Sequence, residues 1–134
     1  MKVKIKRIDK SIPLPAYKTA GAVALDCSSR LHIIAEPNKL TYIPLNVCIK
    51  TPKGHYALLA GRSSLPKKGL LLATGVGIMD EDFCGNGDEY QAPLYNFTDQ
   101  PITIERGDRI AQIIIKPYEK VDWEEVDDLG APDR

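Results

Sequence analysis

Short apolar runs recur along the whole chain. The clearest alternation of polar and apolar side chains is VKIKRI (residues 3–8), and alternation with a period of two is typical of a strand with one buried face. The other runs are rich in β-branched or aromatic residues, which also favour strands. These runs lie at residues 31–35, 40–50, 56–61, 90–97, 102–106 and 109–121.

Glycine and proline separate these runs. The chain contains 10 residues of each, in turn segments such as TPKG (51–54). Many short strands at regular intervals predict an all-β sandwich, jelly roll or barrel. We expect one short helix, with Ser63 or Ser64 as its N-cap, Pro66 in its first turn and Gly69 at its end.

The length of 134 residues suits one domain that can fold without metals or disulfides. The strand periodicity is lost after Val126, where the sequence becomes acidic. We therefore expect residues 1–126 to form a single domain. Residues 127–134 are expected to form a C-terminal arm, either flexible or exchanged between subunits.

Charge and cysteine content argue against several classes of protein. The 18 basic and 18 acidic residues balance, so no overall charge attracts nucleic acid or an anionic membrane. Cys27, Cys48 and Cys84 are odd in number and lack CxxC spacing, which argues against a disulfide framework or a zinc site. Neither a signal peptide nor a membrane-spanning apolar run is evident, so we expect a soluble, cytoplasmic protein.

One segment suits the binding of phosphate. AGRSSLPKKG (60–69) combines Arg62, Ser63, Ser64 and the start of the expected helix. Together they offer a forked guanidinium, two hydroxyls and free backbone N–H groups. The alternative is a capped helix with a solvated basic end, but a cap alone needs no preceding arginine.

Two polar residues stand out against apolar surroundings. Asp26, in GAVALDCSS, follows an apolar strand and by itself indicates an Asx turn or cap. Gln112, in ERGDRIAQIII, is the uncharged polar residue of a buried strand that begins after a turn at Gly107 and Asp108. Buried amides need hydrogen-bond partners, so a bond from Gln112 to backbone is expected.

The segment GVGIMDEDFCGN (75–86) places acidic residues between apolar ones inside a glycine-framed turn. Asp80 follows Ile78 and Met79, which would partly shield its carboxylate from water and suit it to accept a proton. An acidic hairpin turn without catalytic function is the alternative.

In their order and spacing, these segments resemble the hallmark motifs of the trimeric dUTP pyrophosphatase (dUTPase) family. The motifs appear here as GAVALDCSS, GRSSL, GIMDEDFCG and GDRIAQ, and the resemblance spans about residues 18–118. It implies a distorted jelly-roll or β-barrel fold and a homotrimer with sites at subunit interfaces. It also implies Mg²⁺-dependent hydrolysis of dUTP to dUMP and pyrophosphate, which limits uracil in DNA and supplies dUMP for thymidylate synthesis.

The resemblance also implies roles in binding the deoxyuridine. Asp80 would orient and deprotonate the attacking water. The ring of Phe83 would pack against the deoxyribose, so that a 2′-hydroxyl would clash. Backbone groups around Thr74, Gly75 and Gly77 would pair with the edge of the uracil.

The remaining motifs imply the half of the site that binds phosphate. Asp26 would hold the magnesium–triphosphate complex through coordinated water. Arg62, Ser63 and Ser64 would contact the phosphates, and Gln112 would add a side-chain hydrogen bond there.

The sequence also departs from the family pattern. Phe83 replaces the usual tyrosine, and Ala24 stands where glycine is common. The fifth, glycine-rich motif is not found, and Arg134 is expected to correspond to its first arginine. Glu81, between the two aspartates of the hairpin, is expected to point to solvent.

Two alternative functions remain open at this stage. A dCTP deaminase would share the fold and similar motifs, but it needs a catalytic glutamate on the strand after the hairpin, and YQAPLYN has none. The other is a non-catalytic, dUTPase-like protein that binds a partner through its arm.

Overall fold

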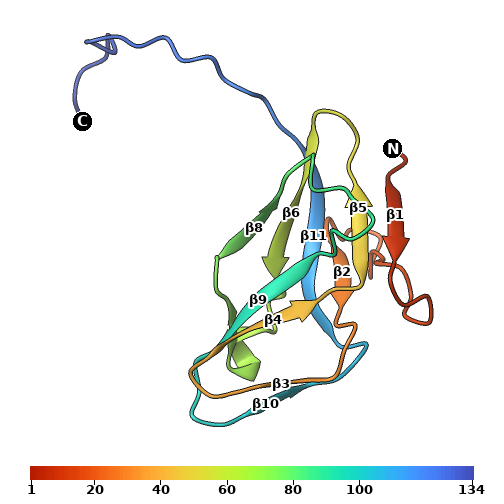
Figure 1. The fold of residues 1–134 in the computed structure, drawn as a ribbon. Coiled ribbons are helices and arrows are strands. Elements are labelled where there is room, and N and C mark those ends of the chain that lie inside the picture. The colour runs from red at the N-terminus through yellow and green to blue at the C-terminus, as the bar shows by residue number, and fades with distance from the viewer.

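The computed structural model describes residues 1–134 and is built almost entirely of short strands (Figure 1). The prediction of an all-β fold is confirmed. The strands are β1 (Lys4–Arg7), β2 (Leu25–Ser28), β3 (Ile33–Ala35), β4 (Leu40–Pro44), β5 (Val47–Lys50), β6 (His55–Gly61), β7 (Leu70–Leu72), β8 (Val76–Met79), β9 (Gln91–Asn96), β10 (Ile102–Ile104) and β11 (Arg109–Pro117), and the single 3₁₀ helix is η1 (Pro66–Lys68).

Two antiparallel sheets supply most of the core. One has the strand order β2-β11-β6-β8 and the other β4-β9-β7, while β1 pairs with β5 and β10 pairs with β3. The alternation along β6 buries Ala57 and Leu59, and that along β9 buries Ala92 and Leu94. These side chains belong to one contiguous apolar core.

The helix is shorter than the sequence suggested and lacks the expected cap. Pro66 begins it, and Gly69 ends it at a positive φ of 90°, as predicted. Leu65 occupies the N-cap position and no side chain caps the helix, so the prediction of a serine cap is wrong. The hydroxyl of Ser64 instead accepts a bond of 3.4 Å from Nη1 of Arg62.

The apolar run 40–50 forms two strands rather than one. It is interrupted at Asn46, which adopts a left-handed φ of 72°. The backbone N–H of Asn46 donates to Glu89 at 2.9 Å, and its side-chain oxygen accepts from the backbone of Asp9 at 2.6 Å. The bend is therefore stabilised by partners that are distant in sequence.

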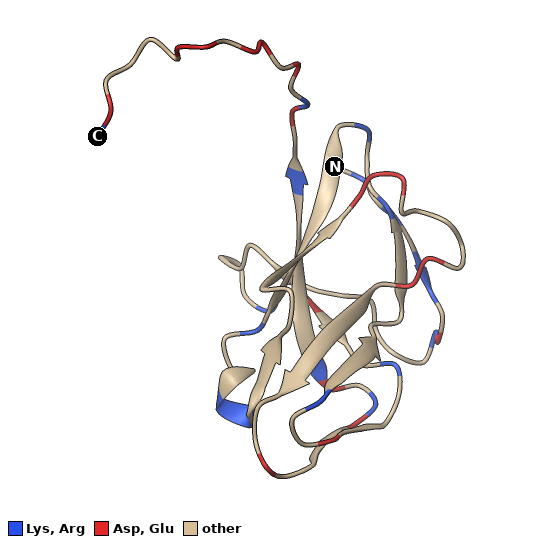
Figure 2. Ribbon diagram, turned by 60° about the vertical axis from the view of Figure 1, so that its left-hand side comes forward, with Lys and Arg blue, Asp and Glu red and all other residues tan.

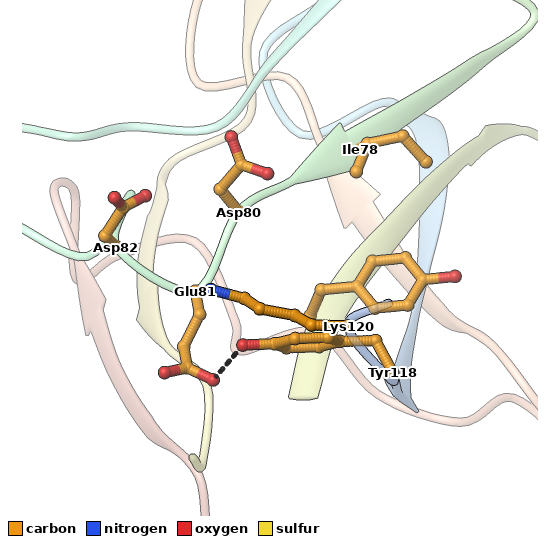
Figure 3. Close-up of a pocket in the computed structure, with 7 residues that line it drawn as sticks. Ile78, Asp80, Glu81, Asp82, Tyr118 and Lys120 are labelled. Carbon is orange, nitrogen blue, oxygen red and sulfur yellow. Dashed lines mark hydrogen bonds between the residues drawn. The ribbon is translucent and has the colours of Figure 1, made fainter. Parts of the chain in front are cut away.

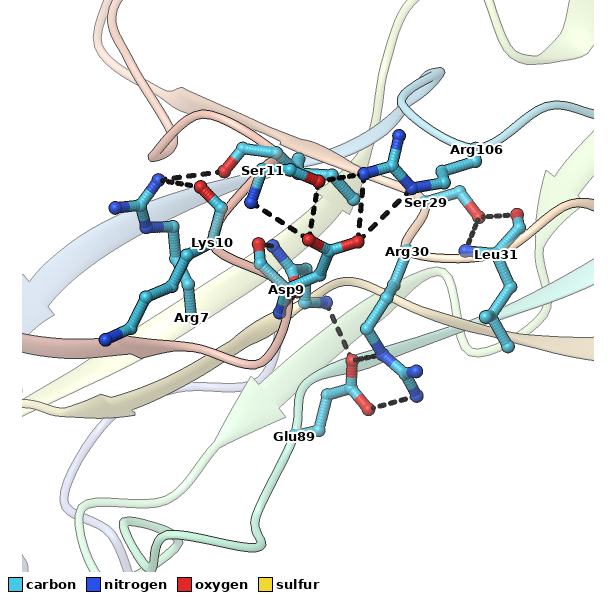
Figure 4. Close-up of polar contacts among 11 residues, drawn as sticks. Arg7, Asp9, Lys10, Ser11, Ser29, Arg30, Leu31, Glu89 and Arg106 are labelled. Carbon is cyan, nitrogen blue, oxygen red and sulfur yellow. Dashed lines mark hydrogen bonds and ion pairs between the residues drawn. The ribbon is translucent and has the colours of Figure 1, made fainter.

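A polar network around this bend holds the N-terminal segment to the barrel (Figure 4). Glu89 binds both Nε and Nη2 of Arg30, at 2.8 and 3.0 Å. Asp9 receives a bond of 2.9 Å from Nη2 of Arg106, near the other end of the chain. The segment after β1 is thus tied to two loops of the barrel.

Residues 119–134 leave the barrel after β11 and are all exposed (Figure 1). They contain no strand or helix, and acidic positions dominate their course (Figure 2). No helix in the chain is long and apolar enough to cross a membrane. The division into a domain of residues 1–126 and an arm of residues 127–134 stays a prediction.

Candidate functional site

Residues from three separate motifs meet where β6 leaves its sheet. In the paired strands, Gln112 of β11 lies opposite Asp26 of β2 on one side and Ala60 of β6 on the other. Nε of Arg62, just beyond β6, lies 3.4 Å from the carboxylate of Asp26. The amide of Gln112 donates to the carbonyl of Gly61 at 3.1 Å, which confirms the expected bond to backbone.

Arg109 joins this group, although the sequence reasoning did not single it out. Its Nη1 lies 3.5 Å from the second oxygen of Asp26, and its carbonyl accepts a bond of 3.3 Å from Arg62. The register of β11 against β2 shifts between Arg109 and Ala111. Such a bulge re-aims side chains, so that Arg109 falls on the face of Gln112, three residues later. We call Asp26, Arg62, Arg109 and Gln112 the Arg62 cluster.

The charges of the Arg62 cluster suit an anion. Two guanidinium groups converge on one carboxylate, and the Asp26 side chain is only 11% exposed while that of Arg109 is 44% exposed. The excess positive charge faces outward, where forked N–H groups match phosphate oxygens. Of the two serines beside Arg62, Ser63 is exposed and Ser64 is bonded to Arg62.

The sequence predicted that Asp26 follows a strand. In the structure Asp26 lies within strand β2. Its neighbour Cys27 is fully buried, and burial raises the pKa of this thiol to about 12. A thiol with so high a pKa carries no thiolate at neutral pH, so Cys27 is a core residue and not a nucleophile.

The Asp80 hairpin (residues 76–83) packs on the opposite edge of β6. Gly77 is needed for this contact, because a Cβ atom there would lie 3.0 Å from Cβ of Leu59. The turn before it contains the exposed Thr74 and Gly75, which has a φ of 75° and donates its N–H to Leu72 at 2.9 Å. The turn is therefore exposed to solvent, while its own backbone bond fixes its shape.

Asp80 is exposed, and its carboxylate makes no hydrogen bond or ion pair within the chain. Its carbonyl accepts the N–H of Phe83 at 3.1 Å, which closes a turn. Asp80 opens onto a pocket of about 500 Å³ (Figure 3). The pocket is lined by Tyr56, Ile78, Asp80, Glu81, Asp82, Tyr118 and Lys120.

Glu81 was expected to point to solvent, but it is half-buried and one of its carboxylate oxygens is bonded within the chain. One of its oxygens, Oε1, accepts from the backbone N–H of Gly54 at 2.6 Å and from the hydroxyl of Tyr118 at 2.9 Å (Figure 3). The bond from Gly54, followed by that from Tyr118, lowers the pKa of Glu81. Both donors come from distant segments, so local sequence could not reveal them.

Phe83 is 37% exposed, and its ring stacks on the buried ring of Tyr90. The ring centroids are 6.1 Å apart and the planes are inclined by 25°. Tyr90 thus forms a platform that holds one face of Phe83, and the partly exposed ring is available to a ligand.

Asp80 and the Arg62 cluster lie at different ends of β6, although the hairpin begins near the cluster, where Val76 pairs with Ala60. Met79 pairs with Ala57, whereas Arg62 lies five residues further along the chain, a separation of about 17 Å at a strand rise of about 3.3 Å per residue. One chain therefore does not bring Asp80 close to Asp26 and Arg62.

The donor set limits how a metal ion could bind. No three His, Cys, Asp or Glu residues are grouped to hold one. Asp26 is the carboxylate of the Arg62 cluster, and a single carboxylate fits a Mg²⁺ ion that keeps most of its water and is bound mainly by ligand phosphates.

The chain combines an all-β fold with the Arg62 cluster and a separate acidic hairpin. These features are typical of β proteins that bind phosphorylated ligands. Within this class, the chain belongs to the dUTPase family, whose model matches residues 10–134. A deoxyuridine 5′-triphosphate nucleotidohydrolase of Dictyoglomus turgidum is 37% identical, over 100% of this chain and 92% of that protein.

Solved structures share the fold. The dUTPase of Streptococcus mutans superposes with a TM-score of 0.81 at 28% identity, covering 89% of this chain and 98% of that one. A variant dUTPase from phage phi11 of S. aureus has a TM-score of 0.82 at 18% identity, covering 96% and 99%. That phage protein coordinates a structural Mg(II) ion.

Proposed function

We propose that this protein is a dUTP diphosphatase, which hydrolyses dUTP at the α-phosphorus to dUMP and pyrophosphate. The observation that carries the proposal is the convergence of Asp26, Arg62 and Gln112 from three separate motifs into one cluster. This convergence occurs in a chain that is 37% identical to a deoxyuridine 5′-triphosphate nucleotidohydrolase. The activity would limit uracil in DNA and supply dUMP for thymidylate synthesis.

The Arg62 cluster would bind the triphosphate. The guanidinium of Arg62 and the hydroxyls of Ser63 and Ser64 would contact phosphate oxygens. Gln112 uses one amide N–H to hold the carbonyl of Gly61 and keeps the other for a phosphate. The negative charge of Asp26 would offset the repulsion between the guanidinium groups of Arg62 and Arg109 when no substrate is bound.

Mg²⁺ fits the proposal as an ion that arrives with the substrate. Asp26 would hold it through coordinated water. When bound, the ion would neutralise charge on the phosphates and so favour attack at phosphorus.

The Asp80 hairpin would bind the nucleoside and activate water. Asp80 has no partner within the chain, so its carboxylate is free to orient a water molecule and accept its proton. Backbone groups at Thr74, Gly75 and Gly77 would pair with the uracil edge. Phe83, held by Tyr90, would lie against the deoxyribose.

We infer a homotrimer with sites between subunits. The separation of about 17 Å along β6 between Asp80 and Arg62 supports a site completed by a second copy. An apolar groove of about 480 Å³, lined in part by Ile113, Ile114 and Ile115, is open in the single chain and would be covered by assembly. The arm, with Trp123 and Leu129 each 91% exposed, would cross to a neighbouring subunit.

We also place the protein in the cytoplasm. All three cysteines are free, and they include Cys84, which is partly exposed. Free thiols without a disulfide framework fit a reducing compartment.

A pyrophosphate-release assay with dUTP, dCTP, dTTP and UTP in the presence of Mg²⁺ tests the proposal. We expect turnover of dUTP well above that of the other three nucleotides, and its loss without Mg²⁺. Ammonia release from dCTP would instead indicate a deaminase. No turnover of any nucleotide by the folded protein would favour the non-catalytic role.

A further inference from the structure

The position of Asp80 depends on its neighbours, because its own carboxylate has no partner in the chain. On its N-terminal side, the backbone is fixed by the pairing of Met79 with Ala57. On its C-terminal side the ladder has ended, and only the turn bond from Phe83 to Asp80 is local. Something further must fix this side of the hairpin if Asp80 is to hold one position.

The side chain of Glu81 supplies that anchor. Its Oε1 atom accepts from the backbone of Gly54 at 2.6 Å and from the hydroxyl of Tyr118 at 2.9 Å. Gly54 and Tyr118 are themselves joined, since the N–H of Tyr118 donates to the carbonyl of Gly54 at 3.0 Å. We call Gly54, Glu81 and Tyr118 the Glu81 clamp.

The clamp is also rigid on its aromatic side. The rings of Tyr118 and Tyr56 pack edge to face, with centroids 6.3 Å apart and planes at 64°. The hydroxyl of Tyr118 is bonded to Glu81, whereas the hydroxyl of Tyr56 has no hydrogen bond within the chain. The Tyr118 ring is therefore held by packing against Tyr56. The hydroxyl of this ring, through its bond to Glu81, holds the hairpin.

Three segments distant in sequence meet in this clamp. They are the turn between β5 and β6, the Asp80 hairpin, and the residue just after β11, before the exposed arm. Figure 3 shows the bond between the last two. We propose that Glu81 and Tyr118 are positioning residues, which act through the hairpin backbone to hold the Asp80 carboxylate in its catalytic position. This inference rests on the proposed dUTP hydrolysis.

Substitutions of Glu81 can distinguish the effect of its hydrogen bonds from the effect of its charge. Both bonds end on the same oxygen atom, so the amide oxygen of a glutamine can accept both. Glu81→Gln should thus keep the clamp, whereas Glu81→Ala removes it. Tyr118→Phe removes one donor and keeps the ring, and Tyr56→Phe is the matched control that loses an unbonded hydroxyl.

The first experiment measures kcat and KM for dUTP in these four variants. Because small displacements of a reacting group can reduce rates by about 100-fold, we expect Glu81→Ala to lower kcat by roughly 10- to 100-fold, with KM within about threefold. Tyr118→Phe should show a smaller loss of the same kind. Glu81→Gln and Tyr56→Phe should stay within about twofold of the parent.

The double variant Glu81→Ala with Tyr118→Phe should be no slower than Glu81→Ala alone, because the hydroxyl acts through Glu81. Equal losses in Glu81→Gln and Glu81→Ala would overturn the inference, since charge would then be the cause. A kcat within twofold of the parent in Glu81→Ala, or a loss in Tyr56→Phe equal to that in Tyr118→Phe, would also overturn it.

A second measurement does not depend on turnover. Amide hydrogen exchange of residues 81–83 should become faster in Glu81→Ala and remain unchanged in Glu81→Gln. Unchanged amide exchange in Glu81→Ala would show that the Glu81 side chain does not stabilise the hairpin. A parent protein that fails to hydrolyse dUTP would contradict the proposed function, whereas dUTP hydrolysis indifferent to Glu81→Ala would contradict the clamp alone.

Discussion

Nε of Arg62 lies 3.4 Å from the carboxylate of Asp26, although Arg62 follows β6, Asp26 lies on β2, and these two strands do not pair with each other. Strand β11 lies between those strands and brings the two side chains together. Their side chains are 25% and 11% exposed, so the pair is partly shielded from water. Asp26 thereby orients a guanidinium that would otherwise have to be ordered by the substrate.

Arg62→Lys should test the role of this forked group. A lysine keeps the charge but cannot make paired N–H bonds to a phosphate or a carboxylate. We expect KM for dUTP to rise by about tenfold, equivalent to about 1.4 kcal/mol, with an unchanged unfolding temperature. Steady-state kinetics with Lys67→Arg as a control on the exposed helix would measure it, and a KM within twofold of the parent would contradict the assignment.

Asp80→Asn should abolish most turnover and leave binding intact. The amide has the shape of the carboxylate but cannot accept a proton, and loss of a general base reduces rates by about 10²–10⁴. Calorimetry with a non-hydrolysable dUTP analogue would measure the retained affinity. Asp99→Asn, which alters an exposed carboxylate in another loop, should retain the parental rate; near-normal turnover in folded Asp80→Asn would exclude Asp80 as the base.

The assembled protein should have three times the mass of the chain. Trp123 is the only tryptophan and is 91% exposed in the single chain, so it reports on the arm. If the arm crosses to a neighbour, Trp123 fluorescence should shift to shorter wavelength in the trimer and to longer wavelength on dilution. Light scattering that gives a monomer at assay concentrations would contradict the interface model.

Acid should destabilise the fold through Asp9. Hydrogen bonds from Ser11, with that from Arg106, lower the pKa of Asp9 from 3.8 to about 2 (Figure 4). Because the folded-state pKa is depressed, the ionised carboxylate stabilises the protein above pH 4, and this contribution is lost as the pH falls from about 4 to about 2.

Asp9→Asn should therefore make the free energy of unfolding less dependent on pH within this window. Urea unfolding at a series of pH values and one fixed protein concentration would measure it. Asp128→Asn, in the exposed arm, is the matched control and should follow the parent. A pH profile of Asp9→Asn that coincides with the parental profile would contradict the assignment.

Local signals in the sequence were sufficient for much of the fold. Alternation predicted β1, and a run of apolar and aromatic residues predicted each of β6 and β9. The structure gives β6 and β9 one buried face each, whereas β1 has no buried residue. Pro66 and Gly69 marked the ends of the helix through their own backbone preferences. The division of run 40–50 was missed, because the left-handed bend at Asn46 depends on Glu89 and Asp9.

The candidate site divides in the same way. The motif spacing identified Asp26, Arg62 and Gln112, and the structure brings these three together. Arg109 was missed because a bulge, which the alternating pattern does not reveal, places it beside Asp26. The partners of Glu81 come from tertiary contacts alone. The catalytic and ligand-binding roles of these residues stay predictions.

Selection of the sugar should depend on Phe83. Its ring is 37% exposed, stacks on Tyr90 and carries no hydroxyl that could receive a 2′-OH. A ribonucleotide would have to bury an unpaired hydroxyl against the ring, which costs about 1–3 kcal/mol before any steric strain. Selection against cytosine has a different origin, since it depends on backbone donors and acceptors at the base edge.

Phe83→Ala should therefore weaken the preference for dUTP over UTP more than the preference for dUTP over dCTP. The ratios of kcat/KM for the three nucleotides measure both effects in one preparation. Phe97→Ala, which removes an exposed ring outside the hairpin, should leave both ratios unchanged. An unchanged dUTP to UTP ratio in Phe83→Ala would show that the ring does not face the sugar, because removing it would then relieve neither the clash nor the burial of the 2′-hydroxyl.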